Sequence, residues 1–199
     1  DEALDQKLSR LMFEGPEAEL TLTANAQPAL MALSLAITRV LKKDAGIDFG
    51  KVAKLVAGHS LGEYTALAAV GAFSLSDAAR LLRRRGTAMQ QAVPVGEGAM
   101  AALLGLDLAA AREVALEAVD GVAGWVCDAA NDNAPGQVVV SGHKAAVERA
   151  VKLAAARGAK RAMMLAVSAP FHCALMRPAA EAMQEALQTT SMATPEVPV

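Results

Sequence analysis

A serine between two glycines, set between a short apolar run and a helix-forming segment, constrains this chain most. The apolar run is Leu55-Val56-Ala57, the turn is Gly58-His59-Ser60-Leu61-Gly62, and the helical segment runs from Glu63 to Val70. A strand, a G-x-S-x-G turn and a helix in this order form a nucleophile elbow, which holds Ser60 on a strained bend with its hydroxyl exposed. The tight turn predicts that neither flanking glycine position has room for a side chain. The helix start offers unpaired N–H groups to a developing oxyanion.

Two other structures fit the same residues. The serine could lie in a plain β–α turn, or the glycines could form a phosphate-binding turn. The other parts of the chain decide between them and the elbow.

The composition favours one domain, or a domain with an inserted lobe, built from closely packed helices around a small sheet. Apolar residues make up 54% of the 199 residues, but only 3% are aromatic. A net charge of −2 argues against nucleic acid or a membrane surface as a partner. The uncharged stretch 20–38 contains Pro28 and several polar residues, so it predicts a buried helix rather than a membrane span.

The two cysteines, Cys127 and Cys173, lack the spacing of metal ligands. They indicate free thiols in a reducing compartment, and we expect a cytoplasmic protein. No constellation of residues suggests a metal site, and no glycine-rich fingerprint suggests a dinucleotide.

The N-terminal part predicts two helical segments. Residues 1–19 carry an amphipathic stripe that ends at a Gly-Pro pair. A longer helix then begins at Thr23 or Asn25, has Pro28 in its first turn, and is closed by Gly46. Because this helix is apolar on almost all sides, we expect it to be buried.

A third helix follows the elbow and contains one arginine that does not fit its pattern. It starts at Ser74 or Ser76 and runs to about Ala92. Its inward positions, at spacings of three and four, are Ala78, Leu82, Arg85, Met89 and Ala92. Its solvent side is covered by Arg80, Arg83, Arg84, Thr87 and Gln91.

Arg85 therefore occupies a position where an apolar residue is expected. An unpaired guanidinium removed from water costs several kcal/mol, so it needs an anion. One possibility is an internal partner such as Glu63, and another is a side chain that reaches back to the surface. The functional alternative is a clamp that holds a substrate carboxylate through two parallel hydrogen bonds.

After a hinge at 94–98, the pattern changes to a compact alternating unit. Strands are predicted at 99–104, 125–130, 137–141 and 162–167, and helices at 108–119 and 144–156. The order strand–helix–strand–strand–helix–strand is that of a ferredoxin-like fold. We therefore predict a small lobe, residues 96–167, inserted into a larger α/β lobe formed by 1–95 and 168–199.

Three histidines remain to be placed. His172 follows the last strand and precedes a helix predicted from about Ala174 to Leu187, where the helix dipole favours a neutral imidazole that can act as a base. His143 is interpreted as a helix cap. His59 adjoins the serine and is interpreted as lining the site rather than abstracting the proton.

Taken together, these motifs resemble the malonyl-CoA:acyl carrier protein transacylase family. The resemblance rests on Gly58 to Tyr64, Arg85-Gly86 with Met89-Gln90, Asn133 to Gln137, Pro170-Phe171-His172 and the opening Asn25 to Ala29, and it covers essentially the whole chain. It implies an α/β-hydrolase-like larger lobe, with a parallel sheet and the nucleophile elbow, and a ferredoxin-like small lobe. It also implies malonyl-CoA and acyl carrier protein as substrates, fatty acid biosynthesis as the context, and no cofactor.

The resemblance also assigns roles to individual residues. Ser60 is implied to be the acylated nucleophile, His172 its general base and acid, and the Leu61 N–H a part of the oxyanion hole. Arg85 is implied to pair with the malonyl carboxylate. The remaining substrate-binding positions are His59, Met89 and Asn133, with Asn131 as the alternative contact to the pantetheine arm.

The chain departs from the family at both ends. The N-terminal strand and the Gly-Gln-Gly-Ser-Gln loop of the family do not precede Asp1, and the sequence stops at Val199 before a segment that would orient the histidine. We therefore expect a fragment rather than a minimal enzyme.

Two alternative functions stay open. A serine hydrolase or thioesterase would need an acidic third member between the serine and the histidine in chain order. The available candidates are Asp77, Asp107, Asp120, Asp128 and Asp132. An inactive fragment would bind the carrier protein but form no acyl-serine.

Overall fold

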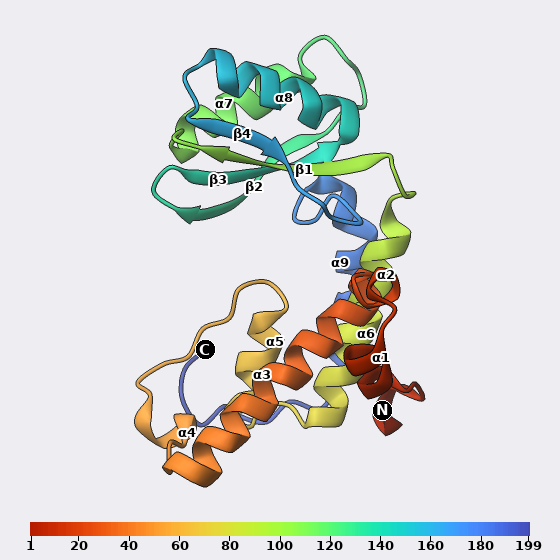
Figure 1. Cartoon of the computed structure of the whole chain (residues 1–199), viewed down its shortest axis with the longest axis vertical. Coiled ribbons are helices and arrows are strands. Elements are labelled where there is room, and N and C mark those ends of the chain that lie inside the picture. The colour runs from red at the N-terminus through yellow and green to blue at the C-terminus, as the bar shows by residue number, and fades with distance from the viewer. The chain divides into compact units, whose positions relative to one another are not determined.

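The computed structural model describes all residues from 1 to 199, and they form two compact units. Unit 1 comprises Asp1–Thr87 and Glu181–Val199, and unit 2 comprises Ala88–Ala180. The division falls within two helices, α6 (Leu75–Ala92) and α9 (Arg177–Thr189). Figure 1 shows helices alone in the first unit and a sheet in the second.

Unit 1 is built from helices along its first 87 residues. Before α6 they are η1 (Glu2–Leu4), α1 (Leu8–Glu14), α2 (Glu17–Leu20), α3 (Thr23–Ala45), α4 (Phe49–Val52) and α5 (Gly62–Ala69). The core of the unit joins α3, α6 and α9, and its largest members include Met31, Leu35, Phe73, Leu82 and Met183. Ser74 starts α6, because its hydroxyl accepts the Asp77 N–H at 3.0 Å.

The strand predicted at Leu55-Val56-Ala57 is wrong. A strand exists only where its backbone groups form a ladder with a neighbour. In this run the one such bond joins the Val56 N–H to the Pro198 carbonyl at 2.9 Å. Unit 1 consequently contains no sheet, and the elbow follows an extended segment instead of a strand.

The expectation that α3 is buried on all sides is also wrong. Met31 and Leu35 are 1% and 6% exposed, whereas Leu30, Leu33, Ile37 and Val40 are 51 to 55% exposed. Helices α1, α2 and α5 pack against α3, but they and the core cover only one side of it. The end of the helix is as predicted, with Gly46 in the left-handed conformation at φ 68°.

Unit 2 contains one antiparallel sheet with two helices. Its elements are β1 (Gly98–Leu104), α7 (Leu108–Val119), β2 (Cys127–Ala134), β3 (Gln137–His143), α8 (Lys144–Ala156), β4 (Arg161–Met164) and η2 (Ala174–Met176). The strand order is β2-β3-β1-β4, with Ala101 opposite Val140 on one side and Met164 on the other. This is the predicted ferredoxin-like arrangement.

Both helices cover the same face of this sheet, as Figure 1 shows. Between them and the strands lies a core of small apolar residues, including the fully buried Leu103, Val114, Val138, Val140 and Val147. Both helices have the predicted bounds. The last three strands differ from prediction. Strand β2 extends to Ala134 by pairing with β3, β3 continues to His143 by pairing with β1, and β4 pairs with β1 only as far as Met164.

His143 occupies the N-cap position of α8, but its side chain does not cap that helix. Instead, its Nδ1 accepts the Val126 N–H at 2.9 Å and ties the start of β2 to β3. The predicted capping role of this side chain is therefore wrong. None of the helices in the chain combines the length and the apolar character that crossing a membrane requires.

Candidate active site

The serine of the G-x-S-x-G turn has the strained backbone that the motif predicts. Ser60 adopts a left-handed conformation at φ 53°, which is uncommon for a residue with a side chain. The Gly62 N–H donates to the His59 carbonyl at 2.9 Å, and the Glu63 N–H donates to the Ser60 carbonyl at 3.2 Å. These two bonds close the bend on which the serine lies, immediately before α5.

The two glycines of the turn have different surroundings. A Cβ at Gly58 would lie 1.9 Å from the Gly62 carbonyl carbon, so only glycine fits there. A Cβ at Gly62 would meet no atom within 4 Å. The expected lack of space is therefore confirmed at Gly58 and wrong at Gly62, because only the first glycine faces the backbone across the turn.

The backbone next to the serine offers an unused donor. Helix α5 begins at Gly62, and Leu61 is its N-cap residue with φ −58°. No hydrogen bond is formed by the Leu61 N–H, while the Gly62 N–H is already used within the turn. A free donor at the start of a helix is suited to stabilise a developing negative charge on an oxygen.

An open hollow adjoins the elbow within unit 1. It is lined by the elbow itself, by α5, by one side of α3 and by Phe49 of α4. Most of its lining is apolar, and the buried hydroxyl of Thr65 has no hydrogen-bond partner there. His59 is exposed and is one of the residues that line this hollow.

Arg85 and Ser60 are in direct contact. The Arg85 Nη2 donates to the Ser60 Oγ at 3.1 Å, and the Nη1 donates to the Gln27 Oε1 at 2.6 Å. The guanidinium carbon also lies 5.9 Å from the centre of the Tyr64 ring. Arg85 thus extends from α6, is half-buried and points to Ser60.

No carboxylate neutralises this arginine. Arg85 takes part in none of the chain's salt bridges, and Glu63, the internal partner considered above, is exposed. Burial lowers the pKa of the Arg85 guanidinium, and Tyr64 and Glu63 partly oppose this effect. The positive charge therefore lies next to Ser60 with neutral hydrogen-bond partners only, which leaves it available to an anionic ligand.

Gln27 is a residue of this site that sequence reasoning did not identify. It is 2% exposed, its Nε2 donates to the Thr23 hydroxyl at 2.8 Å, and its Oε1 accepts from Arg85. The sequence did contain a signal for this residue, since polar side chains occur in the first turn of an otherwise apolar helix. A buried amide needs a specific hydrogen-bond partner, so such a side chain indicates a contact with another part of the chain.

A neighbouring arginine was placed incorrectly by the sequence pattern. Arg83 does not lie on the solvent side but is half-buried, where it donates to Asn25 at 2.8 Å and to Gln6. Burial lowers its pKa. Arg84 is exposed as predicted and pairs with Glu185 at 3.3 Å.

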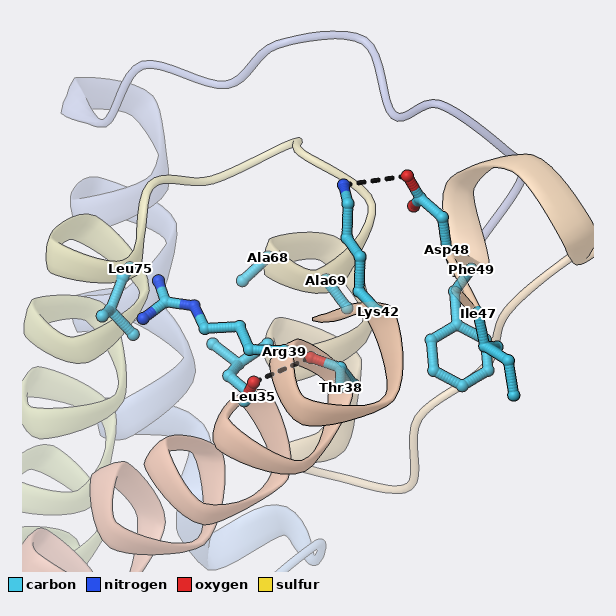
Figure 2. A pocket seen from close by; sticks show the side chains of 10 residues that line it. All are labelled: Leu35, Thr38, Arg39, Lys42, Ile47, Asp48, Phe49, Ala68, Ala69 and Leu75. Atoms are coloured by element: carbon cyan, nitrogen blue, oxygen red, sulfur yellow. Dashed lines mark hydrogen bonds and ion pairs between the residues drawn. The ribbon is translucent and has the colours of Figure 1, made fainter. Parts of the chain in front are cut away.

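A second pocket of unit 1 lies at the end of α3 and contains none of the predicted site residues (Figure 2). Lys42 and Asp48 point toward each other and form an ion pair of 2.8 Å that ties the end of α3 to the start of α4. Their hydrogen bond raises the pKa of Lys42 and lowers that of Asp48. Because Lys42 and Asp48 pair with each other, neither charge is left to act on a substrate, and we do not consider this pocket a candidate active site.

The remaining predicted site residues belong to unit 2. His172 lies between β4 and η2 in a left-handed conformation at φ 60°. Met89 is 6% exposed within an apolar cluster that includes Val93 and Met176. Asn133 is exposed near the end of β2.

Both cysteines are free thiols, as predicted. Burial raises the pKa of Cys127 to about 12, and burial also raises the pKa of Cys173, although nearby hydrogen-bond donors partly oppose the second shift. Both thiols are therefore protonated near neutral pH and poor nucleophiles. No group of three or more His, Cys, Asp or Glu side chains in the chain is arranged to hold a metal ion.

Three candidates for the acid of a hydrolase triad already have other partners. Asp77 bonds to Ser74 at 2.6 Å and pairs with Arg80 at 3.2 Å. Asp107 caps α7 by accepting the Ala110 N–H, and Asp128 accepts the Ala174 N–H, both at 2.8 Å. Each of these carboxylates thus either accepts a hydrogen bond near the start of a helix or pairs with an exposed arginine.

The acyl transferase domain family matches residues 1–199, which is the whole chain. A malonyl CoA-acyl carrier protein transacylase of Bacillus subtilis (strain 168) is 49% identical over 199 residues, and the chain spans 61% of its length. The crystal structure of an acyl-carrier-protein S-malonyltransferase from Bartonella henselae has a TM-score of 0.93 at 57% identity, covering all of this chain and 62% of that one.

A further solved structure contains a partner. It is a malonyl-transacylase in complex with a type II polyketide synthase acyl carrier protein, with a TM-score of 0.92 at 45% identity, and it too covers all of this chain and 62% of the other. The chain thus spans about three fifths of the proteins that it resembles. Because the family match extends over every residue, the chain belongs to the acyl transferase domain family.

Proposed function

We propose that this chain carries the malonyl-transfer site of a malonyl-CoA:acyl carrier protein transacylase, with Ser60 as the acylated nucleophile. The observation that carries the proposal is the 3.1 Å hydrogen bond between Ser60 and an arginine that has no carboxylate partner. A serine alone indicates only acyl chemistry. A serine beside an uncompensated cation indicates an acyl group with a negative charge.

The length of the malonyl group fits this arrangement. Its carboxylate carbon and its thioester carbonyl carbon are separated by two bonds, roughly 2.5 Å. A carboxylate held by Arg85 therefore keeps the carbonyl within reach of the Ser60 Oγ, which the same guanidinium contacts. An acetyl group would leave the guanidinium unpaired, and this difference favours malonyl over acetyl.

The reaction is a two-step acyl transfer. The Ser60 Oγ attacks the thioester carbonyl, and His172 accepts the hydroxyl proton. The carbon–sulfur bond then breaks, the CoA sulfur takes the proton from His172, and malonyl-Ser60 remains. The pantetheine thiol of the carrier protein next gives its proton to His172 and attacks the ester carbonyl. The bond from this carbon to the Ser60 Oγ then breaks, His172 returns the proton to the Ser60 Oγ, and the carrier is loaded. The Leu61 N–H stabilises the oxyanion in both steps.

The other assignments complete this proposal. His59 lines the acyl site, Met89 contributes an apolar wall, and Asn133 contacts the pantetheine arm. We place these residues in an α/β-hydrolase-like larger lobe (1–95 and 168–199) and a ferredoxin-like lobe (96–167). The protein works in fatty acid biosynthesis in the cytoplasm, with malonyl-CoA and acyl carrier protein as substrates, without a cofactor and without a nucleic acid or membrane partner.

Product analysis tests the proposal. The chain is incubated with malonyl-CoA and pantetheinylated acyl carrier protein, and both proteins are weighed by intact mass spectrometry. Malonyl-Ser60 and malonyl-carrier are expected, and both should be lost in Ser60→Ala. Free malonate with an unloaded carrier would show a hydrolase, and the absence of any adduct would show a fragment without this activity.

A further inference from the structure

The backbone at His172 has an unfavourable conformation that its surroundings must maintain. Its φ of 60° is left-handed although the residue carries a side chain. Such a conformation persists only where neighbouring groups hold it, and it sets the direction of the imidazole. The contacts of the flanking residues therefore help to determine the direction in which this side chain leaves the backbone.

On the N-terminal side of His172, residues 168–171 are held mainly by packing. Pro170 lies against Gly98 of β1, where a Cβ would come within 2.3 Å of the proline ring. Gln90 donates to the Ser168 carbonyl at the long distance of 3.5 Å. Cys173 donates from its Sγ to the Pro170 carbonyl at 3.1 Å, a bond that spans His172 within the segment itself.

On the C-terminal side, a hydrogen bond from the backbone ties residues 173–176 to the sheet. The Asp128 Oδ2 accepts the Ala174 N–H at 2.8 Å. Side chains alternate along a strand, and Cys127 belongs to the core under α7 and α8. Asp128 therefore points from the opposite face of the sheet, where the segment that carries His172 lies.

The strands supply a rigid base for this contact. Asp128 is paired with Ser141 of β3, and Ser141 is paired with Met100 of β1. Met100 and Ser141 are 5% and 0% exposed, and the Leu165 N–H donates to the Met100 carbonyl at 2.8 Å. The Asp128 carboxylate thus extends from three paired strands, β2, β3 and β1. The chain that leads to His172 is hydrogen-bonded to the last of these strands through Leu165.

We propose that Asp128 is a positioning residue for His172. Its carboxylate fixes the Ala174 N–H, two residues after the histidine, and so maintains the left-handed backbone that aims the imidazole. This inference rests on the proposed function in assigning His172 as the base. The order of residues in the sequence also allows Asp128 to be the acid of a catalytic triad. In this inference Asp128 instead acts on the backbone next to His172.

The test compares Asp128→Ala with Asp128→Asn in the full chain. The alanine variant removes the acceptor, whereas the asparagine variant keeps an oxygen in the same position. Asp132→Ala is the matched control, because Asp132 lies exposed on the same strand and makes no side-chain hydrogen bond. Three quantities are measured: hydrogen exchange of the Ala174 amide, the NMR signals and pH titration of the His172 ring, and the rate of malonyl-Ser60 formation.

In Asp128→Ala, exchange at Ala174 should become roughly tenfold faster or more, because a hydrogen bond to a charged group is lost. The His172 ring signals should shift, and acylation should slow by roughly ten- to hundredfold as the base loses its alignment. Asp128→Asn should restore all three quantities toward the wild type, and Asp132→Ala should leave them unchanged.

The outcomes separate this inference from the proposed function. An unchanged His172 signal in Asp128→Ala, or an asparagine variant that behaves like the alanine variant, would overturn the positioning role. If the wild type itself forms no malonyl-Ser60, the proposed function fails, and the exchange and ring measurements still decide whether Asp128 holds the histidine.

Discussion

The two units of this chain use their apolar residues differently. In unit 2, the sheet and its two helices close around a core whose central members are fully buried. In unit 1, the face of α3 that carries Leu33 and Ile37 is about half exposed, and the segment before the elbow has no strand partner. The difference teaches that unit 2 buries its apolar side chains and pairs its strands within itself. Unit 1, which carries the elbow, has more apolar surface than its own helices cover.

The largest expected effect concerns the cores. Leu103→Ala removes a fully buried side chain from unit 2 and should lower the free energy of unfolding by about 2–5 kcal/mol. Leu33→Ala truncates a side chain that is 52% exposed in unit 1 and should change the free energy by only about 0.5 kcal/mol. Denaturation followed by circular dichroism compares the variants, and the fluorescence of the single tryptophan, Trp125, reports on unit 2. Equal losses would remove the distinction between the units.

The next effect concerns the glycines of the elbow. Gly58→Ala places a Cβ against the Gly62 backbone, which cannot move away, so malonyl-Ser60 formation should fall roughly a hundredfold as the serine is displaced. Gly62→Ala meets open space and should keep the wild-type rate within about threefold. Acylation time courses by intact mass measure both. Similar rates for the two variants would contradict the difference in space between the two glycines.

A smaller effect is expected at Gln27. Gln27→Ala removes the acceptor at 2.6 Å that orients the Arg85 guanidinium, and should slow malonylation about tenfold. Gln27→Glu supplies an internal carboxylate that competes with the substrate, so it should also weaken malonyl-CoA binding. The dependence of the acylation rate on malonyl-CoA concentration separates a slower acylation step from weaker binding of malonyl-CoA. A glutamate variant that binds as tightly as the wild type would argue against a carboxylate site at Arg85.

Much of unit 2 was predictable because its patterns are local. The helices at 108–119 and 144–156 and the strand order follow from periodicity and turn residues. In unit 1, the Ser60 bend and the Arg85 anomaly were also visible as sequence patterns. The strand at 55–57, the burial of α3 and the environment of Arg83 were not, because each depends on tertiary partners. Gln27 was missed for the same reason, since its role exists only once α3 and α6 are in contact.

The selectivity of Ser60 for a charged acyl group tests the role of Arg85. The rates of acylation by malonyl-CoA and acetyl-CoA are measured by intact mass for the wild type, for Arg85→Ala and for Arg84→Ala, a control on the same helix whose arginine is exposed and paired with Glu185. Arg85→Ala should lower the ratio of malonyl to acetyl acylation by about a hundredfold or more, because it removes the cation proposed to hold the malonyl carboxylate, and Arg84→Ala should leave the ratio unchanged. An unchanged preference for malonyl in Arg85→Ala would contradict the carboxylate clamp.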